Sequence, residues 1–138
     1  MNIVGHGIDL VHIPRVQEMV EAHGQRFLDR CFTAAEQAHC LSGAGGTGGA
    51  GGGKRRYEHL AGRFAAKEAI LKALGTGWRA GIAWTDMEIL PDGQGAPVVQ
   101  LTGQTAQIAA ARGITGWFLS ISHVETHATA SAIAVDAG

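Results

Sequence analysis

The sequence predicts a single α+β domain in which a mainly antiparallel sheet is wrapped around and beside a long central helix. A Pro-free, Ala- and Leu-rich run over residues 60–75, closed by a glycine, predicts the helix. Five shorter segments have the pattern or composition of strands, and a Pro- and Gly-containing turn joins two of them into a hairpin. A chain of 138 residues fits one domain, spanning residues 1–138.

The composition excludes several classes of protein. Hydrophobic residues make up 46% and charged residues 17%, which is typical of a globular protein and not of a disordered one. No apolar run approaches the roughly 20 residues of a membrane span, so we expect a cytoplasmic protein without a membrane partner. A formal charge of -1 argues against nucleic acid as a partner. Cys31 and Cys40 have neither disulfide-framework nor zinc spacing, and we expect reduced thiols.

The first strand, predicted over residues 3–11, carries an acid. Its alternation places Ile8 and Leu10 on one face and Asp9 on the other. Gly5 and Gly7 remove side chains on the face of Asp9, which lets a ligand or another backbone come close. By itself, an Asp near a strand end is more often a cap or a solvated residue than a ligand.

A helix is predicted over residues 14–22, ended by Gly24. Arg15 and Met19 lie one turn apart on it, and Arg26 follows the break, so the three could form a basic patch with an apolar centre. Solvated arginines are the commoner case. A short helix should follow from Thr33 to about Leu41, because Thr33 and Glu36 have the spacing of a capping box.

Residues 42–53 contain only Gly, Ala, Ser and Thr and predict a flexible Gly-rich loop. The basic triplet Lys54-Arg55-Arg56 follows, where we expect the N-terminus of the central helix, whose backbone N–H groups favour anions. With Arg63 on the same helix, the triplet fits phosphate binding about as well as it fits a solvated charge run.

The central helix has an apolar stripe that a charge interrupts. The stripe consists of Leu60, Phe64, Leu71 and Leu74. Lys67 falls within it, Glu68 flanks it and Lys72 follows one turn later. A partly buried charge needs a partner, a metal or an anionic ligand. The simpler interpretation is that Lys67 extends its amine to water and that Glu68 and Lys72 form an ordinary i,i+4 ion pair.

The remainder of the chain predicts a strand over residues 82–90, a turn over 91–97, a strand over 98–101, a helix over 102–112 and strands over 117–122 and 128–135. His123 and His127 have an HxxxH spacing. Because the segment between them is a turn between strands, a paired zinc site is not expected there.

Four separated motifs point to one family. They are Gly7-Ile-Asp9-Leu10, Arg63-Phe-Ala-Ala-Lys67-Glu68-Ala69 with Lys72-Ala-Leu-Gly75-Thr-Gly77, Trp84-Thr-Asp-Met-Glu-Ile89, and Ser120-Ile-Ser-His123. In this order and spacing they resemble the holo-acyl-carrier-protein synthases, the small homotrimeric group of 4'-phosphopantetheinyl transferases. The resemblance covers nearly the whole chain and implies the fold of that family.

The resemblance implies a magnesium-dependent transfer of 4'-phosphopantetheine from coenzyme A to a serine of acyl carrier protein, with release of adenosine 3',5'-bisphosphate. Asp9 and Glu68 are then the metal ligands, since Mg²⁺ prefers carboxylates together with phosphate oxygens and water. Asp9, Glu68 and Lys72 are the implied catalytic residues. Lys72 would stabilise the phosphates, and Glu68 or a metal-bound water would take the serine proton.

The resemblance also implies the substrate contacts. For coenzyme A these are Lys54, Arg55, Arg63 and His123, with the turn containing Gly95 and Pro97 near the adenine. Arg15, Met19 and Arg26 match the side chains that the family presents to the carrier protein. A homotrimer is implied, with active sites at subunit interfaces.

Two other functions remain open at this stage. A non-catalytic module would bind coenzyme A or carrier protein without turnover, although the intact Asp9, Glu68 and Lys72 speak against it. An RNA-binding subunit depends only on Lys54-Arg55-Arg56, without interleaved aromatic residues or a net positive charge.

Overall fold

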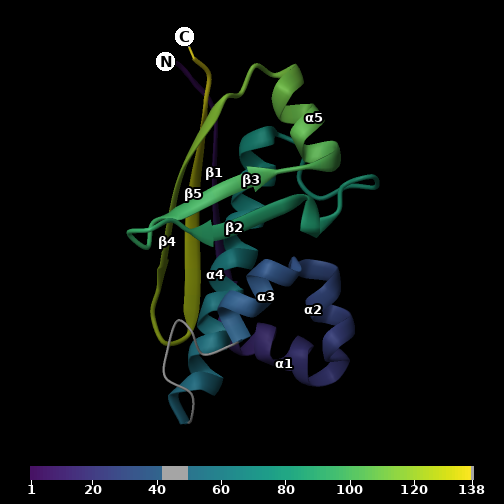
Figure 1. Ribbon diagram of the computed structural model, residues 1–138, viewed down its shortest axis with the longest axis vertical. Coiled ribbons are helices and arrows are strands. Elements are labelled where there is room, and N and C mark those ends of the chain that lie inside the picture. Colours follow the sequence, from purple (N-terminus) through teal and green to yellow (C-terminus); the bar gives the residue numbers. More distant parts are fainter. Residues whose placement is uncertain (42–49, 138) are drawn as a thin grey trace.

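The computed structural model describes residues 1–41 and 50–137. They form an α+β domain in which helix α4 (Ala50–Leu74) runs through the middle (Figure 1). Strands β1 (Ile3–His12), β5 (His127–Val135) and β4 (Gly116–His123) lie along one side of it. Helices α1 (Ile13–His23), α2 (Gln25–Cys31) and α3 (Ala34–Leu41) lie on the opposite side, around the N-terminal half of α4.

The predicted antiparallel strands divide into two sheets. One has the order β1-β5-β4, and the other is the hairpin of β2 (Met87–Pro91) and β3 (Pro97–Leu101). All pairings are antiparallel. In the three-stranded sheet, Asp9 pairs with Ala130, which pairs with Ile121 on the far strand. The hairpin crosses α4 and leads into α5 (Gly103–Ala111) (Figure 1).

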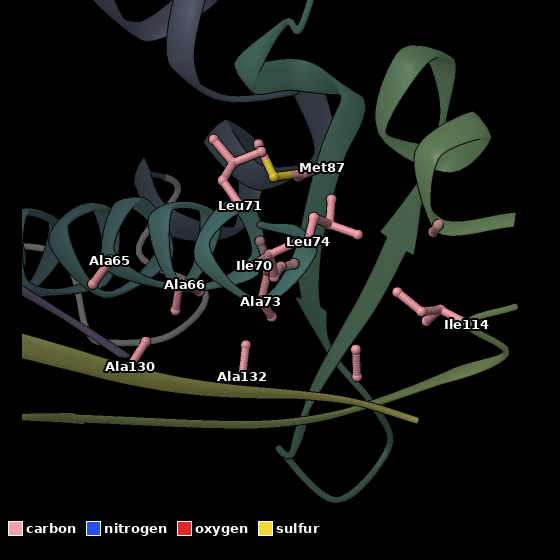
Figure 2. Packing of buried hydrophobic residues seen from close by; sticks show 14 of the residues in the cluster. Ala65, Ala66, Ile70, Leu71, Ala73, Leu74, Met87, Ile114, Ala130 and Ala132 are labelled. Atoms are coloured by element: carbon pink, nitrogen blue, oxygen red, sulfur yellow. The ribbon is translucent and has the colours of Figure 1, made fainter. Parts of the chain in front are cut away.

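Helix α4 packs against the sheet through alanines. Ala65, Ala66, Ala69 and Ala73 are buried on the helix, and Ala128, Ala130, Ala132 and Ala134 are buried on β5. Figure 2 shows Ala65 and Ala66 on the side of the helix that faces Ala130 and Ala132 of β5. The predicted leucines fill the other side of the helix, with Leu60, Leu71 and Leu74 at most 1% exposed. Small side chains therefore bring the sheet unusually close to the helix.

The predicted capping box is confirmed. The backbone N–H of Glu36 donates to Thr33 Oγ1 at 3.1 Å, and that of Thr33 donates to Glu36 Oε1 at 2.9 Å. Gly24 ends α1 as expected, with φ of 57°. Helix α2, which directly follows, was not predicted, because its seven residues are too few for a helical period to stand out.

Two predicted boundaries are wrong. Helix α4 begins at Ala50, so residues 50–53 of the predicted loop are helical, while residues 42–49 of that loop lie outside the described part. The strand expected from residue 82 begins only at Met87, after a 3₁₀ turn at Trp84–Asp86. The carbonyl of Trp84 in this turn accepts a hydrogen bond from Lys67 instead of joining a strand ladder.

In the described part of the chain, no helix is long and apolar enough to cross a membrane. Cys31 and Cys40 are free and buried. Burial raises the pKa of Cys40 to about 11, so this cysteine is a protonated thiol at neutral pH.

Candidate active site

Asp9 and Glu68 lie together beside Lys72. The ammonium of Lys72 contacts Asp9 Oδ1 at 3.1 Å and the backbone carbonyl of Ile8 at 2.9 Å. The side chain of Asp9 is only 12% exposed, whereas that of Lys72 is 52% exposed. An ion pair between Asp9 and Lys72 thus replaces the i,i+4 pair that the helix sequence suggested between Glu68 and Lys72.

Two glycines make this meeting possible. A Cβ on Gly7 would lie 1.9 Å from the carbonyl oxygen of Ala69, and one on Gly5 would lie 2.1 Å from that of Ala73. Both distances are far below contact distance, so only glycine lets β1 lie this close to α4. Of the two purposes predicted for these glycines, the close approach of another backbone is confirmed. It places Asp9 against the helix turn that carries Glu68.

The environment of Glu68 favours its protonated form. Partial burial of this carboxyl, the charge of Asp9 and a hydrogen bond with Asp9 raise its pKa, and the Lys72 ammonium opposes them. Two carboxylates that repel one another at a partly buried position are suited to a hard divalent cation, which supplies the missing positive charge. Within the described residues, no cluster of three or more His, Cys, Asp or Glu could hold a metal. A pair of carboxylates suits Mg²⁺, because this ion takes its remaining ligands from phosphate and water.

Lys67 does not extend to water but lies in a buried ion pair. Its side chain is fully buried, and its Nζ lies 2.7 Å from Glu36 Oε1, itself fully buried. The same ammonium donates to the carbonyls of Cys31 at 2.7 Å and Trp84 at 3.1 Å. The other Glu36 oxygen accepts the backbone N–H of Ile89 at 2.9 Å. This buried ion pair therefore joins α4 to α2, α3, the 3₁₀ turn and β2, one residue before Glu68.

A groove between α1, α2 and α4 leads to Glu68. It has a volume of about 300 Å³ and is lined by Val11, Arg15, Val16, Met19, Phe27, Phe64 and Glu68. Two of the three residues predicted for carrier-protein binding, Arg15 and Met19, thus share a groove with a predicted catalytic carboxylate. Arg26 is exposed on α2 and is not among the lining residues.

The basic residues predicted for coenzyme A lie elsewhere. Lys54 is on the same helix as Glu68 but fourteen residues earlier, roughly 21 Å along the axis. It pairs with Glu125 at 3.1 Å. The triplet 54–56 also lies inside α4, so the expected site at free helix N–H groups is wrong.

Arg63 is 9% exposed and contacts the His59 carbonyl at 3.5 Å, and its Nε has no hydrogen-bond partner among the described residues. Burial lowers the pKa of His59, and the charges of Arg63 and, to a smaller extent, Arg55 lower it further.

The remaining residues that were predicted to contact coenzyme A are His123, Gly95 and Pro97, and they lie at two other places in the fold. His123, on β4, contacts Glu58 Oε2 at 2.5 Å, and its strand is separated from β1 by β5. His127 instead packs its ring on His12 with centroids 5.0 Å apart, so the two histidines of the HxxxH spacing have different neighbours. Gly95 and Pro97 lie at the turn of the β2–β3 hairpin. One copy of the chain therefore brings together Asp9, Glu68, Lys72, Arg15 and Met19, but not the predicted phosphate and adenine contacts.

Comparison with known proteins identifies the family. The family model described as the 4'-phosphopantetheinyl transferase superfamily matches residues 5–131. The chain belongs to the 4'-phosphopantetheinyl transferase superfamily. A holo-[acyl-carrier-protein] synthase of Desulforudis audaxviator is 47% identical over 96% of this chain and 93% of its own. The family and fold class predicted from the sequence are confirmed.

Solved structures of the superfamily agree with this assignment. The holo-[acyl-carrier-protein] synthase of Neisseria meningitidis has a TM-score of 0.82 at 30% identity, over 98% of this chain and all (100%) of that one. The enzyme of Bacillus anthracis, solved in complex with CoA (3',5'-ADP), has a TM-score of 0.76 at 31% identity, with 98% of both chains covered. The predicted activity is the one for which these relatives are named.

For this member of the superfamily, sequence reasoning missed the aromatic residues around Glu68. Phe64 and Trp84 pack with ring centroids 5.0 Å apart, and Trp78 stacks on Trp84 at 6.3 Å. Phe64 was predicted only as a core residue. The signal that could have drawn attention to Trp78 is its position directly after the Gly75-Thr-Gly77 break, where a large apolar side chain has no core to fill.

Proposed function

We propose that this chain is a Mg²⁺-dependent holo-[acyl-carrier-protein] synthase, which transfers 4'-phosphopantetheine from coenzyme A to a serine hydroxyl of an acyl carrier protein and releases adenosine 3',5'-bisphosphate. The observation that carries the proposal is the meeting of Asp9 and Glu68 beside Lys72, from parts of the chain far apart in sequence. The family match over residues 5–131 and the names of the relatives support it.

The three residues have distinct roles in the proposal. Asp9 and Glu68 hold the divalent cation, which when bound neutralises charge on the diphosphate. Lys72, half-exposed and already at the edge of the site, stabilises the phosphate that is transferred. Glu68 accepts the serine proton, directly or through a water. A raised pKa suits a carboxylate to this role, since a more basic group accepts a proton more readily.

The carrier protein docks on α1 and α2. Arg15 supplies positive charge to an acidic carrier helix, and Met19 supplies an adaptable apolar contact at the mouth of the groove that ends at Glu68. Arg26, exposed at the start of α2, adds charge at the rim. The serine of the carrier enters along this groove.

Coenzyme A requires a second copy of the chain. Since Lys54 lies roughly 21 Å from Glu68 along α4, it cannot bind the same diphosphate within one subunit. A homotrimer would let Lys54, Arg55, Arg63 and His123 of one subunit, with Gly95 and Pro97 of the hairpin turn, complete the Asp9–Glu68 site of a neighbour. The outer face of the three-stranded sheet supports assembly, because Ile8, Leu10 and Phe118 are 59%, 66% and 56% exposed there.

The alternative is a module that binds coenzyme A or carrier protein without turnover. It would keep the groove and the basic residues but has no need of the Asp9–Glu68 pair. We favour the enzyme for that reason, and a cytoplasmic location stays a prediction of the same proposal.

Incubation with an apo carrier protein, coenzyme A and Mg²⁺ tests the proposal. Mass spectrometry should show the carrier gaining the mass of one phosphopantetheine arm, and Glu68→Gln should lower the rate by about 100-fold or more with the fold intact. Binding of coenzyme A without any gain of mass, at high enzyme concentration and across several carriers, would establish the alternative instead.

A further inference from the structure

His127 has a histidine partner that its HxxxH spacing with His123 does not reveal. It lies opposite His12, because the two residues pair in the antiparallel register of β1 and β5. The centres of the two imidazole rings are 5.0 Å apart, and the ring planes are inclined by 48°. Side chains directly opposite one another in a sheet are held close by the backbone, so the register of the strands fixes this pair in place.

The separation of the two rings is close to that of two histidines bound to one metal ion. An imidazole nitrogen binds Zn²⁺ at about 2.0–2.1 Å, which puts the centre of the ring roughly 3.2 Å from the ion. Two such rings that meet the ion at the tetrahedral angle have centres about 5.2 Å apart. The observed distance of 5.0 Å agrees with this value. Both side chains can therefore reach a shared ion from the strand positions that they already occupy.

The hydrogen bonds of the two side chains leave a nitrogen available on each. Nδ1 of His127 lies 2.8 Å from Thr126 Oγ1. When Nδ1 carries the ring proton, it donates to this hydroxyl and Nε2 keeps its lone pair, which is the arrangement usual for a metal-binding histidine. His12 precedes α1 and is exposed, and among the described residues its side chain makes no capping hydrogen bond. Water can supply the remaining ligands at such an exposed position.

A second pair of histidines lies together in the fold but has a different electrostatic environment. The rings of His39 and His59 have centres 5.7 Å apart. Burial and, after it, the charge of Arg63 lower the pKa of both histidines. The same charge repels a metal cation. The pair on the sheet has no such neighbour in the next pair on its own face, which consists of Leu10 and Thr129.

We propose that His12 and His127 form a site for a divalent transition-metal ion such as Zn²⁺, with two protein ligands and water. Imidazole suits such ions, whereas Mg²⁺ prefers oxygen ligands, so this site and the carboxylate site select different metals. The backbone N–H of Ile13 donates to the carbonyl of Thr126 at 2.8 Å. A bound ion adds a second link between the start of α1 and the β4–β5 turn, and it stabilises the folded chain. The proposal does not depend on the proposed function.

Binding of Zn²⁺ to the intact protein is measured by calorimetry at neutral pH, with Mg²⁺ in excess to occupy the carboxylate site. Zn²⁺ should bind and should raise the midpoint of thermal unfolding. His12→Gln and His127→Gln should each weaken Zn²⁺ binding by at least about tenfold, because losing even a second partner of a metal ligand costs this much. The double variant His39→Gln with His59→Gln is the matched control and should leave the affinity unchanged.

Nuclear magnetic resonance tests the site without a substitution, because the ring-proton signals of His12 and His127 should change together as Zn²⁺ is added to the native protein. The proposal is overturned if the native protein does not bind Zn²⁺, if the affinity is the same in His12→Gln and His127→Gln, or if the signals of other histidines change instead. None of these results bears on the transferase, since the metal ion is the only ligand added besides Mg²⁺.

Discussion

Replacing Lys67 by methionine removes the cation of the buried ion pair. Methionine keeps the length and most of the apolar surface of the side chain, so the loss is that of the charge and its contacts. The change leaves the carboxylate of Glu36 and the carbonyls of Cys31 and Trp84 without their donor. Because both charged side chains are 0% exposed, no water replaces the ammonium.

Removing one partner of such a pair costs roughly 3–5 kcal/mol. Glu36 keeps the backbone N–H groups of Thr33 and Ile89 as donors, which argues for the lower half of that range. A domain of ordinary stability has about 5–15 kcal/mol in total. Lys67→Met should therefore fold, but with a large part of its stability lost.

Urea unfolding followed by circular dichroism measures this loss. Protein concentration must be fixed, because assembly of subunits would shift the midpoint. Lys72→Met is the matched control, since it is the same change on the same helix at a half-exposed lysine. It should cost less than about 1 kcal/mol. The double variant Lys67→Met with Glu36→Met should regain part of the loss, because no charge is then left buried alone.

A loss below about 1 kcal/mol in Lys67→Met would refute this account. It would mean that the ammonium is hydrated in solution or that Glu36 becomes protonated at little cost. A double variant as unstable as the sum of the two single variants would also contradict it, because coupled partners are not additive.

Three other predictions follow from the site. Gly7→Ala should lose about 1–3 kcal/mol of stability and lower turnover, because its Cβ cannot fit beside the carbonyl of Ala69; a thermal unfolding midpoint equal to that of the native protein would exclude the close packing. Arg15→Ala should raise the KM for the carrier protein, more so at low salt, with the KM for coenzyme A unchanged; an equal rise in both would remove Arg15 from the carrier surface. In the metal-free protein, an NMR titration should show the pKa of Glu68 above its ordinary value of 4.5, and lower again in Asp9→Asn. Because the folded state disfavours the charged form of Glu68, the metal-free protein should lose stability as the pH rises from 4.5 through that raised pKa. A Glu68 pKa that does not change in Asp9→Asn would show that the two carboxyls do not interact.

Local features of the chain were predictable where a short pattern is enough to specify them. The Thr33–Glu36 capping box forms within four residues, and the β2–β3 hairpin closes over one turn. The start of α4 was not predictable in this way. Glycines have poor helix propensity, and the sequence before Lys54 gave no reason to extend the helix back to Ala50.

The residues of the candidate site were likewise predictable only in part. Motif resemblance identified Asp9, Glu68 and Lys72, and the structure brings them together. The partner of Lys67 was not predictable, because Glu36 looked fully used by its capping box.

By itself, the sequence determined the order of the elements other than α2 and the 3₁₀ turn, the apolar stripe of α4 and the motifs that identify the family, since each depends on residues close together in the chain. Tertiary structure alone decided which charges are buried and paired and which remain free for a ligand. The reason is physical: Lys67 and Glu68 are neighbours with similar local surroundings, and only the elements packed on each side of the helix make one a structural ion pair and the other a candidate catalytic carboxylate.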